Sequence, residues 1–378
     1  MNPVEANRSK SGGVQGLTRC TDLIRALTCV RARHLVLFIL PVVITGVLGC
    51  SQNPVRLQPM RIVDDAHSGG NALAISADSR VGASGGWAGR IRLWHLSEGG
   101  SPLASWQTGH GDLVGLMFLA DGKHVLSTGR DGFVRIWELS GRLSQEYPVG
   151  SAVTSFYPGK DANSVVLGHG DGRATHWRVD GRRLGMWKLS GSRITAVTSN
   201  RSGLLFAAAD QSGKVWRWRQ GDEPIQLQSP PSYPRSLVFN PLSAELVGGG
   251  WFDLFSWPAD DDRLRIIPTA HRGIVNHLQF AGDGRYVASI SRQTDSAVLL
   301  LDPRSGETLA GYKKHALCGQ RVALSPDGRI MISNSDDASV RFYRLPEPPL
   351  AVPAVRNENP PRRGPGEFAR RPAQLSGR

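Results

Sequence analysis

Apolar and polar residues alternate in short runs along the middle of the chain, and Gly, Asp and Ser separate the runs. Three such runs are Leu113–Phe118, His124–Ser127 and Phe133–Trp137, with Asp121-Gly122 and Asp131-Gly132 between them. Alternation with a period of two is typical of β-strands, and Asp-Gly is a strong hairpin-turn signal. No stretch in this part of the chain keeps an apolar helical period for three turns. The pattern therefore predicts an all-β fold of short strands joined by tight turns.

The pattern recurs seven times along the chain. Each unit ends on an aromatic or large apolar residue, and successive end points are 39 to 44 residues apart. The end points are Trp94, Trp137, Trp177, Trp218, Trp257, Leu301 and Tyr343. A period near 41 residues is typical of repeat architectures, in which each unit buries its apolar face against its neighbours. The 378 residues, which by length alone suggest two or three domains, are therefore interpreted as one repeat domain with two flanking segments.

The second unit carries the motif of a known family. It begins with Gly109-His110 and ends with Trp137-Glu138, and this pattern resembles the WD-repeat β-propeller family. That family has a buried tetrad made of a His before the first strand, a Ser or Thr in the second, an Asp in the next turn, and the Trp. The resemblance implies that the structural tetrad of this unit is His110, Ser127, Asp131 and Trp137.

The other units keep parts of the same set. The sixth has His271, Ser289 and Asp295, the seventh has His315, Ser333 and Asp337, the first has His67, Ser84 and Trp94 without the Asp, and the third has Asp171 and Trp177. The fourth and fifth units depart most from the motif. The resemblance implies a seven-bladed β-propeller of four-stranded blades over residues 57–345, in which these His residues are structural rather than catalytic.

The ring also has to close, because an open propeller would expose two sheet edges. The seventh unit lacks an outer strand, since the chain enters a Pro-rich segment at residue 346. The segment Leu57–Val63 precedes the first unit and is apolar enough to form a strand. We predict that this N-terminal strand completes the last blade, as in the closure of the family.

The first 49 residues have the layout of a secretory signal. Arg31 and Arg33 precede Leu35–Leu48, an apolar run of 14 residues, whereas a bilayer-spanning helix needs about 20. The segment before Arg31 is long and polar for such a signal, and one hypothesis is that translation begins near Val30, so that residues 1–29 are a mis-assigned start. The alternative reading is a cytosolic scaffold with an uncleaved signal anchor.

The end of this signal resembles the lipobox of bacterial lipoproteins. The four residues are Val47, Leu48, Gly49 and Cys50. The resemblance implies that residues 1–49 are removed, that Cys50 is lipidated, and that residues 50–56 tether the propeller to a membrane on its periplasmic side. By the sorting rule of enteric bacteria, Ser51 after the Cys favours the outer membrane.

The net charge of +13 at first suggests nucleic acid as a partner. Residues 1–49 carry +4 and residues 346–378 carry +3, which leaves +6 for the ring. An exported chain does not meet nucleic acid, so the charge favours an anionic envelope surface or an envelope protein instead. Residues 346–378 are rich in Pro and Arg and are predicted to be a disordered tail, with a basic arm that binds an anionic surface as the alternative.

Enzyme and metal motifs are missing from the sequence. There is no HExxH, P-loop or CxxC pattern, and His169-Gly170-Asp171 and Asp260-Asp261-Asp262 are interpreted as turns and loops. We expect a non-enzymatic protein with no cofactor and no metal. The alternative is a propeller that binds a small ligand or glycan, or performs hydrolysis, in its central channel. First strands such as Ala72–Ile75, Ile194–Val197 and Ser236–Phe239 are small and apolar, which weighs against that alternative.

In the resembled family, loops around the tetrads bind ligands. The residues predicted at this rim are Trp87, Arg130, His169, Arg193, Gln211, Trp251 and Arg292. Trp and Arg are common in interface hot spots, and we expect a monomeric, membrane-tethered protein-binding scaffold whose partner is another envelope protein. The alternative for Trp87 and Trp251 is that they fold inward and cover blades that lack the tetrad Asp.

Overall fold

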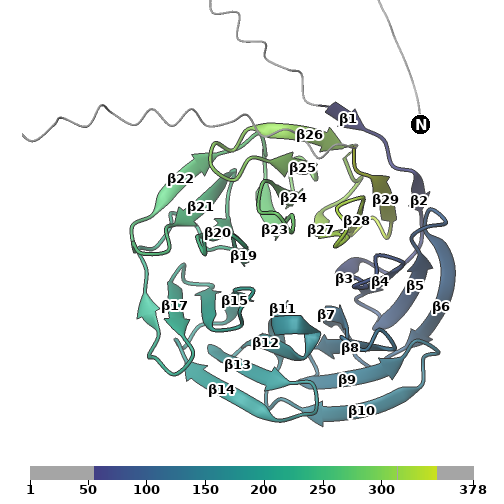
Figure 1. Cartoon of the computed structure of the whole chain (residues 1–378), viewed down its shortest axis with the longest axis horizontal. Helices are drawn as coiled ribbons and strands as arrows, with labels where there is room; N and C mark the ends of the chain where they lie inside the picture. Colours follow the sequence, from purple (N-terminus) through teal and green to yellow (C-terminus); the bar gives the residue numbers. More distant parts are fainter. Residues whose placement is uncertain (1–54, 313, 347–378) are drawn as a thin grey trace, which may run out of the picture. The chain divides into compact units, whose positions relative to one another are not determined.

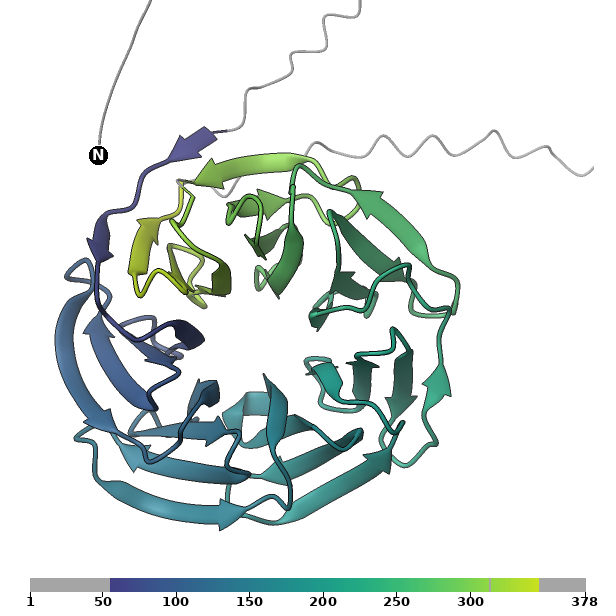
Figure 2. The same cartoon turned by 180° about the vertical axis from the view of Figure 1, so that it is seen from behind.

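The computed structural model describes residues 55–312 and 314–346, so the predicted signal, Cys50 and the predicted C-terminal tail lie outside it. Nearly all of the regular structure in the described residues is β-strand. The strands form seven sheets arranged as blades around a centre, as Figure 1 and, from behind, Figure 2 show. The predicted all-β, seven-bladed propeller is confirmed.

Within each blade the chain runs from the innermost strand outward through antiparallel neighbours. Blade 1 holds β3 (Gly70–Ile75), β4 (Val81–Gly86), β5 (Arg90–His95) and β6 (Ser101–Gln107). Blade 2 holds β7 (Leu113–Phe118), β8 (His124–Gly129), β9 (Phe133–Glu138) and β10 (Leu143–Pro148). Blade 3 holds β11 (Val153–Pro158), β12 (Ser164–His169), β13 (Arg173–Arg178) and β14 (Arg183–Lys188), with the short 3-10 helix η1 (Lys160–Ala162) between β11 and β12.

The remaining blades repeat this order. Blade 4 holds β15 (Ile194–Ser199), β16 (Leu205–Asp210), β17 (Val215–Arg219) and β18 (Ile225–Gln226). Blade 5 holds β19 (Ser236–Phe239), β20 (Leu246–Gly249), β21 (Asp253–Trp257) and β22 (Arg265–Pro268). Blade 6 holds β23 (Ile274–Phe280), β24 (Val287–Arg292), β25 (Val298–Leu301) and β26 (Thr308–Tyr312), and blade 7 holds β27 (Gly319–Leu324), β28 (Ile330–Ser335) and β29 (Val340–Arg344).

The ring closes through an N-terminal strand, as predicted. Strand β2 (Arg61–Val63) pairs antiparallel with β29 and becomes the outer strand of blade 7. Its register places Arg61 opposite Phe342 and Val63 opposite Val340. The first and last parts of the described chain are therefore joined in one sheet.

A second N-terminal strand was not predicted. Strand β1 (Val55–Leu57) pairs parallel with β26, so the sheet of blade 6 has five strands rather than four. Figure 1 shows β1 lying along β26 before the chain continues into β2. Two predictions are corrected by this pairing. The segment Leu57–Val63 is not one strand, and residues 55–56, assigned to a tether, belong to the sheet because the exposed edge of β26 offers unpaired backbone groups.

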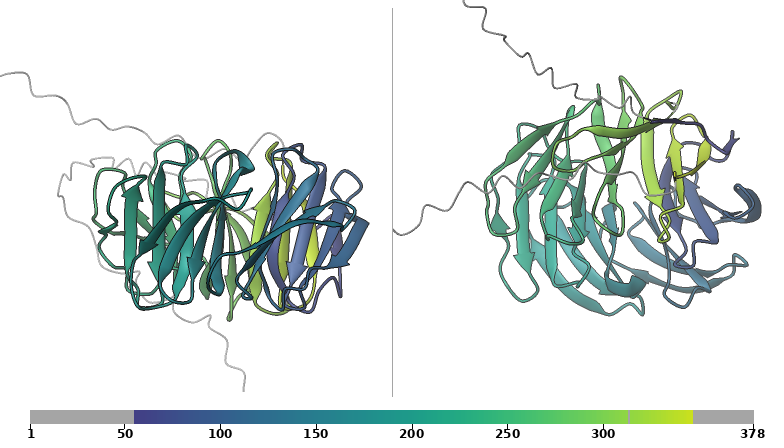
Figure 3. Two further views of the ribbon diagram at one scale, coloured as in Figure 1. Left: turned by 90° about the horizontal axis from the view of Figure 1, so that it is seen from below. Right: turned by 45° about the horizontal axis from the view of Figure 1, so that its top comes forward.

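The core of the ring lies between neighbouring blades. The buried apolar residues of the described chain form seven clusters, each made chiefly by two successive blades. The cluster that contains Trp94 and Phe342 joins blade 1 to blade 7, for example. In six of the blades, the pairing of the first and second strands shifts register near the start of the first strand, which is typical of a β-bulge. Each blade is therefore held by its neighbours, and the ring presents its turns at its two ends (Figure 3).

Candidate partner-binding face

One end of the ring gathers the turns between second and third strands and the loops that enter the first strands. We call this end the tetrad face. The two kinds of loop touch each other there: Arg130 Nε lies 2.6 Å from Asp112 Oδ2, and the Trp87 amide donates to the Gly69 carbonyl. Residues from both kinds of loop are therefore presented side by side.

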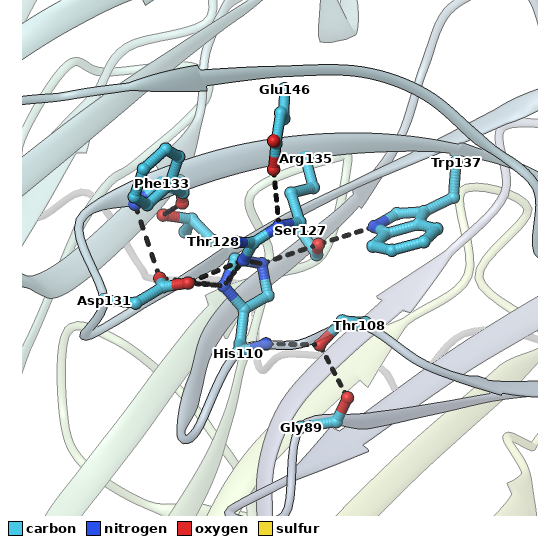
Figure 4. A network of polar contacts seen from close by, with 10 residues as sticks. All are labelled: Gly89, Thr108, His110, Ser127, Thr128, Asp131, Phe133, Arg135, Trp137 and Glu146. Carbon is cyan, nitrogen blue, oxygen red and sulfur yellow. Dashed lines mark hydrogen bonds and ion pairs between the residues drawn. The ribbon is translucent and has the colours of Figure 1, made fainter.

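Blade 2 shows the hydrogen-bond chain that links these loops to the sheet (Figure 4). His110 Nδ1 lies 2.8 Å from Asp131 Oδ1, and His110 Nε2 lies 3.0 Å from Ser127 Oγ. Trp137 Nε1 donates to the same hydroxyl over 2.8 Å. Arg135 adds an ion pair, with its NH1 2.6 Å from Asp131 Oδ2. The four predicted tetrad residues are thus in contact, and Arg135 is a fifth member that sequence reasoning missed.

The electrostatics of this chain favour a neutral histidine beside an ionised aspartate. Burial is the main cause that lowers the pKa of His110, and Asp131 opposes it. Burial on its own would raise the pKa of Asp131, but hydrogen bonds from Arg135 and His110 outweigh it and lower that pKa. A carboxylate is therefore stable at this position because an Arg and a His both donate to it.

Blades 6 and 7 repeat the arrangement. His271 lies 3.3 Å from Asp295 and 2.8 Å from Ser289, measured between the bonded side-chain atoms. In blade 7 the corresponding polar residues are His315, Ser333 and Asp337, at 2.8 Å for His to Ser and 3.2 Å for the closer His to Asp contact. Both blades therefore keep the polar chain although Leu301 and Tyr343 stand where blade 2 has Trp.

Blade 1 has the chain without its carboxylate. His67 Nε2 lies 2.7 Å from Ser84 Oγ, which also accepts from Trp94 Nε1 at 2.7 Å. Ala88 occupies the position of the tetrad Asp, four residues after Ser84. His67 Nδ1 is buried and has no hydrogen-bond partner among the described residues.

Blade 3 has a similar hydrogen-bond chain that is made of different residues. One of the residues predicted at the rim belongs to this chain, and that prediction is wrong. His169, predicted to face a partner, is fully buried at the end of β12. Its Nε2 lies 2.7 Å from Thr175 Oγ1, and Trp177 Nε1 donates to that hydroxyl over 2.9 Å. Burial lowers the pKa of His169. The His, hydroxyl and Trp chain is thus rebuilt from the second and third strands, and His169 is not at the surface.

Aromatic side chains stand exposed on the tetrad face. Trp87 is 47% exposed and Trp251 is 39% exposed, so neither is folded fully inward over its blade. Phe252, which the sequence analysis overlooked, is 47% exposed, and its ring centroid is 5.5 Å from that of Trp251. The adjacent Trp-Phe pair in a turn between strands was the signal that could have revealed it. Exposed aromatic residues of this size are typical of interaction surfaces.

Arginines lie near one another on the same face. Burial lowers the pKa of Arg193, and the neighbouring charges of Arg130 and Arg235 lower it further. Gln211 is exposed, and its backbone N–H donates to the Arg193 carbonyl over 2.9 Å. Arg292 is half-buried and stands apart from this group, with its NH2 3.8 Å from Asp336 Oδ2. The grouped arginines and Gln211 form a polar surface with excess positive charge.

The innermost strands are more polar than predicted. Asn276, Gln279 and Arg321 come from blades 6 and 7, whereas the sequence analysis weighed only apolar examples from other blades. Arg321 Nε donates to the Asn71 carbonyl over 3.1 Å, and Asn276 Nδ2 donates to the Gln320 carbonyl over 3.0 Å. Burial lowers the pKa of Arg321 to about 10. These polar groups tie the inner strand of one blade to the next.

In the part of the chain that the structure describes, no group of three or more His, Cys, Asp or Glu residues could hold a metal ion. A search of the same residues for a helix with the length and apolar character needed to span a membrane found none.

Comparison with known proteins supports the propeller. Residues 58–95, 100–138 and 307–344 match the family model "WD domain, G-beta repeat". The chain is 24% identical over 266 residues to DDB1- and CUL4-associated factor 13 of Dictyostelium discoideum, a match that covers 69% of this chain and 51% of that protein. It is 23% identical over 276 residues to cilia- and flagella-associated protein 52 of Homo sapiens, covering 68% of this chain and 42% of that protein.

This chain therefore spans about half or less of the length of these relatives. Each matched segment takes in the outer strand of one blade and the three inner strands of the next, namely β2–β5, β6–β9 and β26–β29, so the matches include the N-terminal strand that closes the ring. The three matched repeats and the two relatives therefore support the interpretation of this seven-bladed ring as similar to WD-repeat propellers.

Proposed function

We propose that this protein is a non-enzymatic scaffold that binds another protein on the tetrad face of its propeller. The observation that carries the proposal is the exposure of Trp87, Trp251 and Phe252 on one end of the ring, the same end that holds the arginines around Arg193. Large aromatic and Arg side chains contribute most of the binding energy in many protein interfaces. A rigid scaffold also loses little conformational freedom when it binds.

The relatives support the same kind of role. Both are named for assemblies with which they associate, one with DDB1 and CUL4 and the other with cilia and flagella. Because each match spans only about half or less of the relative, we carry over the class of function, protein association, and not the partner.

We further propose that the scaffold works in a bacterial envelope, anchored by lipid on Cys50, with another envelope protein as its partner and without nucleic acid. Support comes from the sequence around Arg31–Ser51, which resembles a lipoprotein signal and its lipobox. Strand β1 begins at Val55, only five residues after Cys50, a span of at most about 18 Å. An anchor at Cys50 would therefore keep the propeller close to the membrane.

Crosslinking in intact cells followed by purification tests the binding proposal. Replacing both Trp87 and Trp251 with Ala is expected to reduce recovery of the partner at least tenfold, because two hot-spot side chains are lost. Ile266→Ala is the matched control, since Ile266 is 50% exposed on the outer strand β22, away from the turns of the tetrad face. Unchanged recovery with the double variant contradicts the proposed face.

Cys50→Ala tests the anchor. The variant is expected to lose labelling by a fatty-acid analogue and to move from the membrane fraction to the soluble fraction. Cys318→Ala is the control, because Cys318 is a free thiol within the ring, half-buried in the loop before β27. If Cys50→Ala remains labelled and membrane-bound, the lipoprotein proposal is wrong.

A further inference from the structure

A small cavity opens in blade 1 where blades 2, 6 and 7 place the tetrad carboxylate. Its volume is about 130 Å³, and its lining includes the buried His67, the turn residue Ala88 and the half-buried Arg92. The exposed Arg90 and Asp65 also line it. The volume is large enough for a few waters or for a carboxylate group, but not for a large ligand.

The spacing of residues in blade 1 matches that of blades 2 and 7. Ala88 follows Ser84 by four residues and precedes Arg92 by four, as Asp131 does between Ser127 and Arg135. The strand register agrees, because Ser84 pairs with Arg92 as Ser127 pairs with Arg135. Blade 1 therefore keeps the groups that hold a carboxylate and lacks only the carboxylate.

Two complete blades show what those groups bind. In blade 2, Asp131 accepts from His110 at 2.8 Å and from Arg135 at 2.6 Å. In blade 7, Asp337 lies 3.2 Å from His315 Nδ1 and 3.4 Å from Arg341 NH2. Blades 2 and 7 thus show how a carboxylate is bound at the position where blade 1 has Ala88.

The donors in blade 1 point to an acceptor that the described chain does not supply. Because Ser84 Oγ accepts from Trp94, its own hydrogen is free to be donated to His67 Nε2, which leaves the imidazole hydrogen on Nδ1. That Nδ1 and Arg92 Nε are both buried without a hydrogen-bond partner among the described residues. Buried donors without acceptors are costly, so a ligand that accepts from both is favoured.

We propose that this cavity binds the carboxylate of an Asp or Glu side chain of a partner protein, which takes the place of the missing tetrad aspartate. The proposal rests on the proposed function, because the carboxylate comes from the protein that docks on the tetrad face. Trp87 adjoins Ala88, and the indole packs on the backbone of Gly69, so an exposed aromatic residue stands at the edge of the cavity. An acidic side chain beside an apolar contact therefore fits this corner of the face.

The charges around the cavity favour an anion. Burial, followed by Arg92 and Arg90, lowers the pKa of His67 to about 3, so His67 is a neutral N–H donor at pH 7. Positive charge then comes from the two arginines, against one carboxylate from Asp65. No hydrogen bond joins Asp65 to either arginine or to His67 in the described chain. The site is cationic, with a directed donor inside it.

Acetate is the first probe, used on the full-length protein. Sodium acetate is expected to shift the imidazole NMR signals of His67 saturably, and sodium chloride at equal ionic strength is expected not to. Ala88→Asp is expected to abolish the shift and to raise the midpoint of thermal unfolding by about 2–4 °C, because it supplies the missing carboxylate. Ala88→Asn is the control, because Asn has the size of Asp but no charge, and it is expected to give less than half of that rise.

Four outcomes overturn the site. The first is no acetate response at His67, and the second is a response to phosphate alone, which would mean a phosphate site. The third is that Asp65→Asn shifts the NMR signals of His67 more than acetate does, which would mean that the chain's own carboxylate fills the cavity. An unchanged unfolding midpoint in Ala88→Asp counts against the site in the same way.

Crosslinking in cells then tests the source of the carboxylate. Ala88→Asp is expected to reduce recovery of the partner at least tenfold, whereas Ala88→Gly, which leaves the cavity open, is expected to keep it. If recovery of the partner is unchanged with Ala88→Asp, the cavity does not take part in binding the partner, and the proposed scaffold function is not affected. A full acetate response with no captured partner removes the proposed function and leaves the carboxylate site standing.

Discussion

Two regions of the ring hold their blades together in different ways. Blades 2, 6 and 7 use a buried His, Asp and Ser chain, and blade 1 uses the same chain without the Asp. Blade 4, with its neighbour blade 3, relies on aromatic packing, in which Phe206 lies 5.4 Å from Trp187 and 5.8 Å from Trp218 between ring centroids. The hydrogen-bonded tetrad is therefore one of several ways in which a blade is fixed to its neighbours.

Among the variants that test this difference, one that removes part of the aromatic core of blades 3 and 4 should cause the largest loss in the free energy of unfolding. Phe206→Ala is expected to lower the free energy of unfolding by about 3–5 kcal/mol, because Phe206 is fully buried and touches His176, Trp187 and Trp218. Urea unfolding measures the loss. Leu204→Ala, at a site that is 56% exposed, is the control and should change stability by less than about 0.5 kcal/mol. Equal losses in the two variants would refute the role of the aromatic cluster.

Removing one residue of the complete tetrad in blade 2 should cause the next largest loss in the free energy of unfolding. Asp131→Ala is expected to cost about 1–3 kcal/mol, because His110 and Arg135 lose a shared acceptor. Acetate in the buffer should restore part of the loss, since the variant recreates the cavity of blade 1. Asp171→Ala, whose carboxylate pairs with the partly exposed Arg173, should cost less than about 1 kcal/mol. Failure of acetate to help would show that the tetrad site does not take a free carboxylate.

Acid should weaken the ring through its buried histidines. The pKa of His67 is lowered from 6.5 to about 3 by burial first, so the unfolded chain binds the proton more readily. The contribution of His67 is therefore fully present above pH 6.5 and is lost as pH falls toward 3, by about 1.4 kcal/mol per pH unit. Urea unfolding at several pH values checks this. His67→Gln should flatten the slope, and an unchanged slope would contradict the assignment.

The smallest expected effect concerns the rebuilt chain of blade 3. Thr175→Val removes the hydroxyl that joins His169 and Trp177 and should cost about 1 kcal/mol. Thr175→Ser keeps the hydroxyl and should stay closer to the wild type. Thermal unfolding of the two variants measures the difference. A Ser variant that is as unstable as the Val variant would mean that packing by the methyl group, not the hydrogen bonds, matters here.

The repeat pattern predicted the ring because the information is local. Turn residues such as Asp131-Gly132 and end points such as Trp137 recur in several units near the same place, and the end points keep one period of 39 to 44 residues. The closing strand was also predictable, since the seventh unit lacked one and the apolar segment Leu57–Val63, which contains the observed strand Arg61–Val63, precedes the first unit. Strand β1 was not, because its pairing with β26 uses backbone groups and leaves no side-chain period in three residues.

The candidate site was predicted less completely. Trp87 and Trp251 are exposed as expected, because turns between strands project from the sheet. His169 was misplaced because it is the last residue of a strand and not the first of a turn, so its side chain faces Thr175. The cavity at Ala88 could not be predicted from Ala88 alone, because it depends on the donors that the structure gathers around a missing group.

The pairing of β1 and β2 with the last two blades has a consequence for how the chain matures. As the chain is synthesised, residues 55–63 emerge more than 240 residues before their partners in β26 and β29. The paired strands are far apart in the sequence, and until β29 has been synthesised the nascent ring has two open sheet edges that can pair with other chains. Completion of the propeller is therefore a late, long-range step, and the interval before it is when the protein is most exposed to aggregation.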